Sequence, residues 1–433
     1  MGLIHLSKSQ HCIGCDCDDS IPAMAGLRPH PDLPMVSQDP RDPAFIQNPY
    51  PFYRKLRALG PLVWWTEYDR AMATTQAAVS TVLRHPGMGR EVPPDRRPQV
   101  TPPLEPFYAV ERHSLLELEP PQHTRIRRIA MQGFGRASLA RMAPEVSRIS
   151  DALIDAFPSG PFDVLEAYAR PLPALVVTRF FGLADDMAAQ LQAWSNDMVA
   201  MYQARRNPEI EHAAGVAAAE FRDFLAEVIS ERRKKPGDDF LSEILSLESK
   251  GVGLSSDELI STVILLLNAG HEATVHSLGN AVARLADHPD RGLVLEPGQI
   301  EGTVEECLRF DPPLHMFSRY VYKPVDIEGV TFHAGDEIGC LLASASRDDA
   351  VWPDGDRFDP LRARRQHLAF GSGIHVCIGA SLARLEMQIA LPILFARCPG
   401  LKVTEPPQFA DAYHFHGYER LVVEVRPANP SST

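Results

Sequence analysis

The sequence predicts a mainly α-helical protein with small β-sheets, folded as a single large domain. Helical patterns dominate residues 122–295, whereas strand-like segments cluster in residues 320–330 and 421–425. No internal repeat of about 20 to 50 residues is visible, which argues against a solenoid. Hydrophobic residues make up 45% and charged residues 23% of the 433 residues, as in ordinary globular proteins. This composition excludes a wholly disordered chain and a coiled coil.

The charge balance and the hydropathy exclude two kinds of partner. The chain has 56 Asp and Glu against 43 Lys and Arg, a formal net charge of −13. Non-specific nucleic-acid binding needs a basic surface, so we expect no nucleic-acid partner. The longest aliphatic run, residues 263–267, is far shorter than the about 20 residues that span a bilayer. No signal-peptide pattern is present, and seven cysteines in a long chain do not indicate a disulfide framework, so we expect a monomeric cytoplasmic protein without a membrane segment.

The chain divides into a flexible, polar, Cys-containing leader (residues 1–45), one large domain (46–427) and a short tail (428–433). The leader contains a cluster of Cys12, Cys15 and Cys17 next to His11. One interpretation is a metal or iron-sulfur site. However, a Cys-x-x-Cys pair does not complete a four-ligand site and no second pair follows, so we favour a disordered cysteine-rich leader.

Residues 86–121 contain nine prolines. Proline fixes φ and removes a backbone donor, so this stretch cannot form one regular element. A long structured loop of this kind often serves as a lid or binding segment.

A long helix is predicted from Ser255 to about Asp287. Ser255 and Glu258 fit a capping box, in which each side chain caps the other's backbone N–H. About 32 residues at 1.5 Å each give about 48 Å, enough to cross the core. Its middle, residues 268–274, contains a glycine and a carboxylate, which are costly inside a buried helix. This stretch indicates either an exposed polar stripe or a functional groove.

The segment 370–379 is a glycine-rich turn followed at once by a helical pattern. Its glycines allow positive φ and a close approach to another group. Cys377 sits beside the helix N-terminus, where free N–H groups stabilise a thiolate. Such a thiolate suits a flat cofactor that carries a metal, and a thiolate ligand on haem iron favours O–O cleavage.

This segment resembles the haem-binding loop of the cytochrome P-450 family, F-G-x-G-x-H-x-C-x-G, at every fixed position: Phe370, Gly371, Gly373, His375, Cys377 and Gly379. The resemblance covers about residues 45–427. It implies that the large domain has the cytochrome P-450 fold, with haem b (iron protoporphyrin IX) between the long helix and the Cys loop. It also implies that Cys377 is the axial ligand of the iron.

Further motifs occur in the family's order. Glu306-x-x-Arg309 resembles the family's structural ion pair, although a Glu and an Arg at this spacing are usually a surface pair when taken alone. His123 and Arg127 share one helix face and resemble the family's propionate-binding helix start. Arg319 and His375 match the other propionate contacts of the family.

The middle of the long helix resembles the family's oxygen-binding groove, usually A-G-x-[D/E]-T-T. The resemblance implies that Ala269 and Gly270 leave room for dioxygen and that Glu272 is the acid of an acid-alcohol pair. This sequence departs from the pattern at Ala273, where a threonine is usual. Thr274 does not replace it, because it points about 100° further round the helix.

The resemblance implies a haem-thiolate monooxygenase of the soluble bacterial type. It would use two electrons, ultimately from NAD(P)H, delivered by a separate ferredoxin or flavodoxin with its reductase. The missing hydroxyl at Ala273 favours a small to medium, oxygen-bearing substrate that completes the proton route. A haem sensor or carrier without turnover is the alternative. Basic residues cluster just before the Cys loop: Arg362, Arg364, Arg365 and His367. This cluster is either a solvated charge run without function or a docking site for the redox partner. We expect an acidic ferredoxin to dock there, because complementary charge raises encounter rates.

Overall fold

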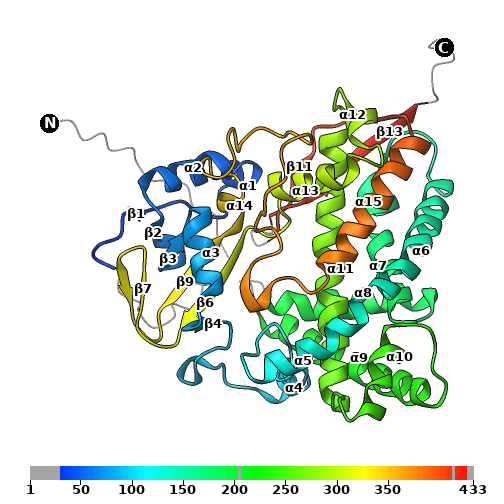
Figure 1. The fold of residues 1–433 in the computed structure, drawn as a ribbon, viewed down its shortest axis with the longest axis horizontal. Helices are drawn as coiled ribbons and strands as arrows, with labels where there is room; N and C mark the ends of the chain where they lie inside the picture. Colours follow the sequence, from blue (N-terminus) through cyan, green and yellow to red (C-terminus); the bar gives the residue numbers. More distant parts are fainter. Residues whose placement is uncertain (1–29, 203–205, 412–414, 427–433) are drawn as a thin grey trace, which may run out of the picture.

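The computed structural model describes residues 30–202, 206–411 and 415–426 (Figure 1). Helices dominate these residues, as the sequence predicted. The helices are α1 Pro43–Gln47, α2 Tyr50–Leu59, α3 Gln76–Arg84, α4 Glu105–Glu111, α5 Gln122–Ala130, α6 Arg136–Asp155, α7 Pro171–Phe180, α8 Ala188–Val199, α9 Pro208–Lys234, α10 Phe240–Ser246, α11 Ser256–Ala286, α12 Arg291–Val294, α13 Ile300–Phe310, α14 Leu342–Ala345 and α15 Ala380–Arg397.

The strands form small sheets, and the largest lies on one side of the molecule (Figure 1). Its strand order is β1-β2-β3-β9-β6-β4, with β1–β2 and β3–β9 parallel and the other pairs antiparallel. Separate sheets are formed by β10-β13-β5, by β11-β12 and by β7-β8. The strands are β1 Met35–Val36, β2 Leu62–Trp65, β3 Arg70–Ala73, β4 Met88–Gly89, β5 Phe162–Asp163, β6 Met316–Val321, β7 Val325–Ile327, β8 Val330–Phe332, β9 Glu337–Leu341, β10 Gly400–Val403, β11 Gln408–Phe409, β12 Tyr418–Arg420 and β13 Val422–Arg426.

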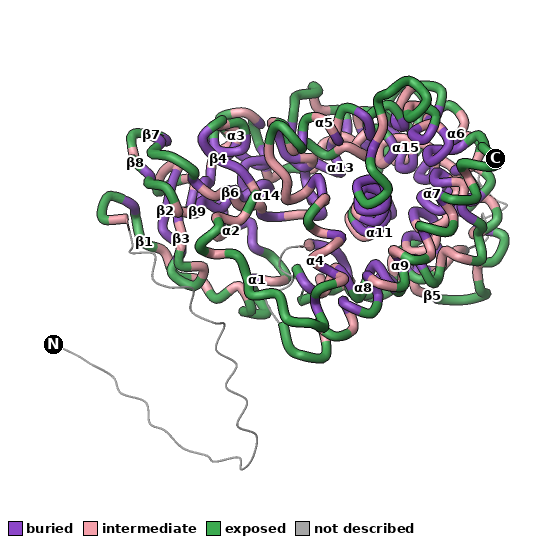
Figure 2. The backbone as a smooth tube through the Cα atoms, turned by 90° about the horizontal axis from the view of Figure 1, so that it is seen from below, coloured by how far each residue is buried: buried purple, intermediate pink, exposed green. Residues whose placement is uncertain are grey.

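The long helix α11 is the axis of the helical part. The Ser255 hydroxyl accepts from the Glu258 N–H and the Glu258 carboxylate accepts from the Ser255 N–H, which is the predicted capping box. Figure 2 shows α11 end-on, mostly buried and surrounded by other helices. Apolar side chains of α11 belong to the largest core cluster, and two smaller clusters lie on the two faces of the main sheet. A helix buried along most of its length holds its central residues in a fixed position.

The described part of the predicted leader, residues 30–45, packs against the main sheet. Strand β1 pairs with β2, and Phe45 is buried against Trp65, whose ring it meets edge-on at 5.8 Å. The indole N–H of Trp65 donates to the Gln38 carbonyl oxygen at 2.9 Å. The fold therefore begins before residue 45. Its edge strand is only two residues long, too short to produce a period that the sequence alone would reveal. Cys12, Cys15, Cys17 and the tail 428–433 lie outside the described residues.

The proline-rich stretch 86–121 is divided into short pieces. It contains the two-residue strand β4, two 3-10 turns and the seven-residue helix α4. Leu104, Phe107 and Val110 from this stretch are buried in the main core. The stretch is thus an ordered part of the domain, and it packs beside α9.

Candidate active site

The segment that carries Cys377 is a tight turn leading directly into α15. Gly371 and Gly373 have φ values of +69° and +75°, which L side chains rarely adopt. A Cβ on Gly373 would lie 2.4 Å from the Leu83 carbonyl oxygen, so the close approach to α3 requires glycine. The Cys377 N–H donates to the Phe370 carbonyl oxygen at 2.9 Å. Figure 1 shows this loop between the sheet-rich part and the helices α11 and α15.

Two opposing effects act on the Cys377 thiol. The residue is exposed, yet its thiol is closely surrounded by protein, and this desolvation raises the pKa of the thiol. Hydrogen bonds from the Gly379 and Ala380 N–H groups, together with the Arg127 and Arg384 guanidinium groups, lower the pKa. Donors and cations of this kind stabilise a thiolate, which is the form that binds a metal.

Cationic side chains gather near this loop. Arg319 on β6 is 3% exposed and donates to the Ser318 carbonyl oxygen at 2.8 Å. Arg127 on α5 donates to the Val376 carbonyl oxygen at 2.6 Å. Within the described residues, neither guanidinium has a carboxylate at ion-pair distance. Desolvation lowers the pKa of both groups, so each would gain from an anion.

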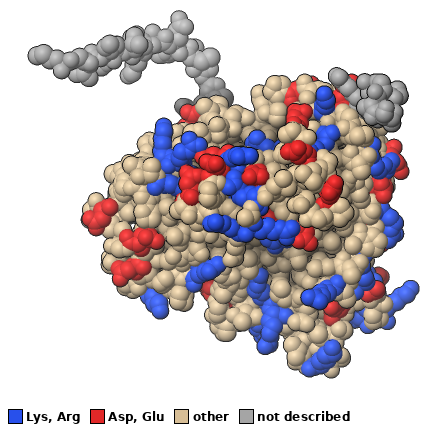
Figure 3. Space-filling model, turned by 45° about the horizontal axis from the view of Figure 1, so that its top comes forward, with Lys and Arg blue, Asp and Glu red and all other residues tan. Residues whose placement is uncertain are grey.

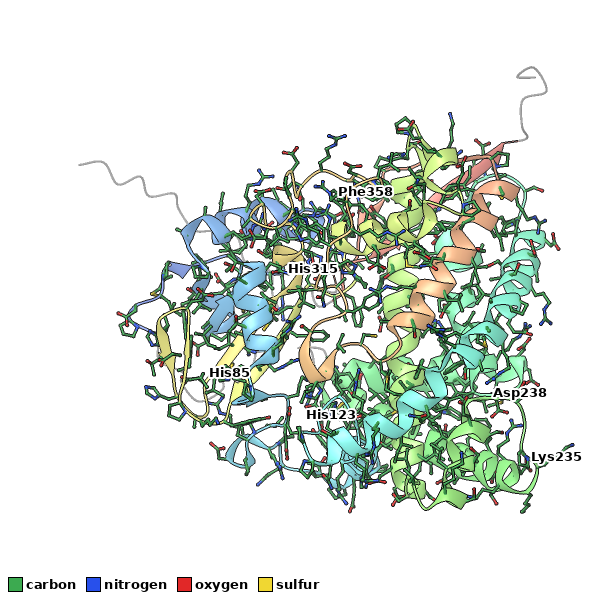
Figure 4. All side chains as sticks on the ribbon, in the orientation of Figure 1. His85, His123, Lys235, Asp238, His315 and Phe358 are labelled. Atoms are coloured by element: carbon green, nitrogen blue, oxygen red, sulfur yellow. The ribbon has the colours of Figure 1, made fainter. Side chains whose placement is uncertain are left out.

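Two histidines join these guanidinium groups in one cluster. The rings of His123 and His375 lie 4.4 Å apart, and Figure 4 shows His123 near the Cys377 loop. His123 is 1% exposed, and neither of its ring nitrogens has a hydrogen-bond partner among the described residues. Burial, with His375 and Arg127 nearby, lowers the pKa of His123 to about 4. His375 Nε2 lies 3.0 Å from Glu119 Oε1. The sequence did not reveal this contact, because the two residues are 256 positions apart in the chain.

These residues fit haem. The cluster offers two guanidinium groups and a buried, unpaired imidazole, which suit the two haem carboxylates. The thiol at the start of α15 suits the iron. Positive φ at Gly371 and Gly373 brings the backbone close to the same region without side chains in the way.

Glu306 and Arg309 form a buried, bidentate ion pair on α13. The nitrogen–oxygen distances are both 2.7 Å, and the two side chains are 5% and 1% exposed. Arg309 also donates to the carbonyl oxygens of Ser346 and Gly355, and Glu306 accepts from the Asp359 N–H at 2.8 Å. The pair therefore fastens α13 to the segment that leads into the Cys377 loop.

The centre of α11 interrupts an otherwise buried helix. Ala269 is exposed, and Gly270, Glu272 and Ala273 are partly exposed. Burial raises the pKa of the Glu272 carboxyl, against the opposing effect of Arg170. The Thr274 hydroxyl donates to the Gly270 carbonyl oxygen at 3.1 Å, within the helix.

His271 points away from this set of small residues. Its Nε2 lies 3.1 Å from Gln192 Nε2 and 3.3 Å from the Arg170 carbonyl oxygen. Two residues apart on a helix, the side chains of His271 and Ala273 point about 200° from each other, which agrees with these contacts. The His271 side chain therefore makes its polar contacts on another face of α11.

Comparison with known proteins decides the family. The model of the family "Cytochrome P450" matches residues 63–291 and 300–409. The chain belongs to the cytochrome P450 family. Cytochrome P450 monooxygenase PikC of Streptomyces venezuelae is 36% identical over 87% of this chain and 89% of its own length. 6-deoxyerythronolide B hydroxylase of Saccharopolyspora erythraea is 35% identical over 66% of this chain and 70% of its own.

Solved structures agree with this assignment. P450BioI, in complex with an acyl carrier protein ligated to hexadec-9Z-enoic acid, superposes with a TM-score of 0.82 and 30% identity, over 88% of this chain and 100% of that one. CalO2 superposes with a TM-score of 0.81 and 26% identity, over 91% and 100%. The chain is thus a cytochrome P450 monooxygenase with the predominantly helical fold of its family, and the family implies haem.

The predicted basic docking cluster is divided in this cytochrome P450. Arg362 lies against Glu306 at 3.6 Å, and His367 is buried 3.3 Å from Glu305 Oε2. Both side chains link this segment to acidic residues of α13, which lie about 60 positions earlier in the sequence. Their charges are therefore used within the protein. Only Arg364 and Arg365 are exposed. On the face in Figure 3, acidic side chains lie directly beside the basic ones.

Two further expectations concern metal ions and membranes. In the described ranges, no group of three or more His, Cys, Asp or Glu side chains is arranged to hold a metal ion. The cysteine cluster of the leader lies outside those ranges. None of the helices of the described residues has the length and apolarity needed to cross a bilayer.

Proposed function

We propose that this cytochrome P450 oxidises a small to medium organic molecule that itself carries oxygen. The observation that carries this proposal is Ala273, which follows the groove acid Glu272 at the position where the family pattern has a threonine hydroxyl. When bound, haem with a thiolate ligand activates dioxygen with two electrons and supplies one oxygen atom to the substrate.

The residues around the Cys377 loop would hold the haem. Cys377 would hold the haem iron through its thiolate, with Gly379 and Phe370 shaping the loop around it. His123, Arg127, Arg319 and His375 would bind the haem carboxylates through charge-assisted hydrogen bonds. Glu306 and Arg309 would act only through the loop, because their side chains are directed into the protein around Ser346 and Asp359.

The residues of α11 would handle dioxygen and protons. Ala269 and Gly270 would leave room beside the helix, and Glu272 would pass protons inward. A raised pKa lets the Glu272 carboxyl keep a proton closer to neutral pH, which suits a general acid. Ala273 has no hydroxyl, and the Thr274 hydroxyl is bound to the Gly270 carbonyl oxygen.

A hydroxyl or carbonyl on the substrate would supply the missing donor or acceptor. Proton transfer needs partners within about 3 Å of one another, and methyl groups cannot serve. We therefore favour a terpenoid, a polyketide-like molecule or an oxygenated aromatic over a bare hydrocarbon. Among the relatives, one is named for the hydroxylation of 6-deoxyerythronolide B and another as a vitamin D(3) 25-hydroxylase.

Electrons would come from NAD(P)H through a reductase and a small ferredoxin or flavodoxin. An acidic partner of this kind would dock where Arg364 and Arg365 are exposed before the Cys377 loop. Complementary charge at this surface would raise the encounter rate more than the final affinity.

The experiment compares a hydroxylated substrate with its deoxy analogue in the reconstituted system. Ligands are first chosen by the shift of the haem Soret band on binding. The product formed per NAD(P)H is then measured together with the peroxide released. We expect tight coupling with the oxygen-bearing substrate and loss to peroxide with the analogue. Equal coupling for both compounds contradicts the substrate-assisted route, and the absence of any product contradicts the monooxygenase reaction.

A further inference from the structure

A stripe of four polar residues runs along α11 at intervals of four. It consists of Glu272, His276, Asn280 and Arg284, and this spacing puts successive members on the same helix face. His276 and Asn280 are 9% and 2% exposed, whereas the Arg284 side chain is 38% exposed. The stripe therefore connects the groove acid to the protein surface through the buried core.

His276 is held next to the groove acid. Its Nε2 lies 4.0 Å from Glu272 Oε1, one helical turn away. On the other side, a Cβ on Gly417 would lie 1.8 Å from His276 Nδ1, so only glycine leaves room for this ring. This distance is longer than a hydrogen bond, and catalytic contacts of this kind often tighten only when the site is loaded.

Beyond His276 the stripe meets a buried polar cluster, formed by Asn280, Asp311 and His416. The Asn280 amide donates to the His416 carbonyl oxygen at 2.9 Å and to the Asp311 carbonyl oxygen at 3.3 Å. The Asp311 carboxylate accepts from Arg284 at 2.8 Å and from Arg347 at 2.9 Å. Arg284 links this cluster to solvent.

Two members of the cluster have polar atoms that nothing in the described residues satisfies. Asn280 Oδ1 and His416 Nε2 are both buried and have no hydrogen-bond partner there. His315 lies between the main sheet and α11 (Figure 4), with its ring 4.2 Å from that of His416 and tilted by 34°. Its own Nε2 has no hydrogen-bond partner among the described residues. Buried polar atoms in folded proteins are nearly always hydrogen-bonded, and ordered water often provides the bond.

We propose that His276 is a proton-relay residue that connects Glu272 to the cluster of Asn280, Asp311 and His416. This inference rests on the proposed function, in which Glu272 passes protons inward. One ring nitrogen of His276 takes a proton from ordered water on the cluster side, and the other nitrogen releases its proton to the Glu272 carboxylate. The imidazole is neutral before and after, and a turn of the ring restores its first tautomer. The proton comes from bulk solvent through this water, and Arg284 keeps its own proton. His276 acts through Glu272 and touches no substrate.

The charges around His276 suit a neutral relay. The groups that act on it are Glu272 and His271 on α11, Arg170 at the start of α7, and His416. Burial, reinforced by Arg170 and His271, lowers the pKa of His276 to about 4. At neutral pH the ring therefore carries one proton and one free lone pair, so it can donate and accept.

The test uses the holoenzyme and the variant His276→Phe, which keeps a flat ring against Gly417. His271→Phe is the matched control, because His271 is also a buried α11 histidine but contacts Gln192 instead. The first readout is the infrared titration of the Glu272 carboxyl in the ferrous carbon-monoxide form, assigned by subtracting Glu272→Gln. The second is the solvent isotope effect on the product formed per NAD(P)H.

We expect His276→Phe to raise the midpoint of the Glu272 titration, because a donor to the carboxylate is lost. We also expect several-fold more peroxide per NAD(P)H, and a larger solvent isotope effect, whereas His271→Phe leaves both readouts near those of the unmodified enzyme. Gly417→Ala should reproduce the shift by displacing the ring. An unchanged midpoint and unchanged isotope effect in an intact His276→Phe holoenzyme overturn the relay. Loss of coupling in the unmodified enzyme itself would instead count against the proposed function.

Discussion

The Cys377 loop and the centre of α11 are both short segments rich in small residues, but they are held in different ways. The loop depends on two glycines at positive φ and on the close approach of Gly373 to Leu83. The buried pair of Glu306 and Arg309 fastens the segment that leads into this loop. The centre of α11 is regular helix, and the Thr274 hydroxyl donates to the Gly270 carbonyl oxygen of the same helix.

This difference explains why one segment matches its family pattern completely and the other does not. A change in the loop alters backbone geometry, so few residues are tolerated. A regular helix accepts alanine in place of threonine without strain, because alanine is the best helix former. Ala273 therefore changes the chemistry near Glu272 while leaving the fold as it is. We expect substitutions near the loop to cost folding and haem retention, and substitutions on α11 to change mainly proton handling.

The largest effect should follow from breaking the buried pair. Glu306→Gln leaves the Arg309 guanidinium buried without a full counter-charge, which typically costs about 3 to 5 kcal/mol. We expect a large drop in the free energy of unfolding, measured by denaturant titration, together with poor haem retention. Glu301→Gln on the same helix is the control, because Glu301 pairs with Arg364 at the surface and exposed pairs contribute at most about 1 kcal/mol. Equal losses for the two variants contradict the structural role of the buried pair.

A smaller effect should appear in the acid stability of the α11 side. The pKa of His276 is about 4 in the fold and an ordinary 6.5 in the unfolded chain. Below pH 6.5 the unfolded chain binds a proton that the folded chain does not, so stability falls as the pH falls towards about 4. The maximum contribution is about 3 kcal/mol. His276→Phe should therefore flatten the loss of stability between these pH values, whereas the exposed His212→Phe should not. An equal loss of unfolding free energy between pH 6.5 and 4 in both variants would contradict this contribution of His276.

Ala273→Thr tests the substrate-assisted route. The added hydroxyl would stand where the family pattern has one, so coupling with the deoxy analogue should recover several-fold, about 1 kcal/mol in the partition between product and peroxide. Ala273→Val is the control, because it adds similar bulk without a hydroxyl. The substrate-assisted route is wrong if Ala273→Thr and Ala273→Val change the product formed per NAD(P)H by the same amount.

The smallest effect concerns the surface near the loop. Reversing Arg364 and Arg365 to Glu should slow electron transfer from an acidic ferredoxin a few-fold at low salt, and the difference should shrink as salt rises. The matched charge reversal uses Lys234 and Lys235, which are exposed at the end of α9. Figure 4 shows Lys235 far from Phe358. Stopped-flow reduction rates compare the two pairs. Similar rates for both double variants contradict the docking site.

The sequence could predict what depends on local pattern. The helical class, the span of α11 and its capping box follow from residues a few positions apart, and the structure confirms them. The family was predicted from the Cys377 loop, and the comparisons confirm it. The sequence could not predict that Arg362 and His367 are internal, because their acidic partners lie on α13. The sequence also could not single out His276, because its neighbour Gly417 is distant in the chain. A histidine in a helical pattern resembles a core residue.

The role of Cys377 is the central claim, and the spectrum of the reduced carbon-monoxide complex tests it most directly. A thiolate ligand gives this complex the long-wavelength Soret band for which the family is named. We predict this band for the holoenzyme and its loss in Cys377→Ala. The buried cysteines provide the controls, and Cys307→Ala, Cys340→Ala and Cys398→Ala should each keep the band. Retention of the band in Cys377→Ala, or its loss in one of the three controls with haem still bound, would contradict the assignment of Cys377 as the ligand.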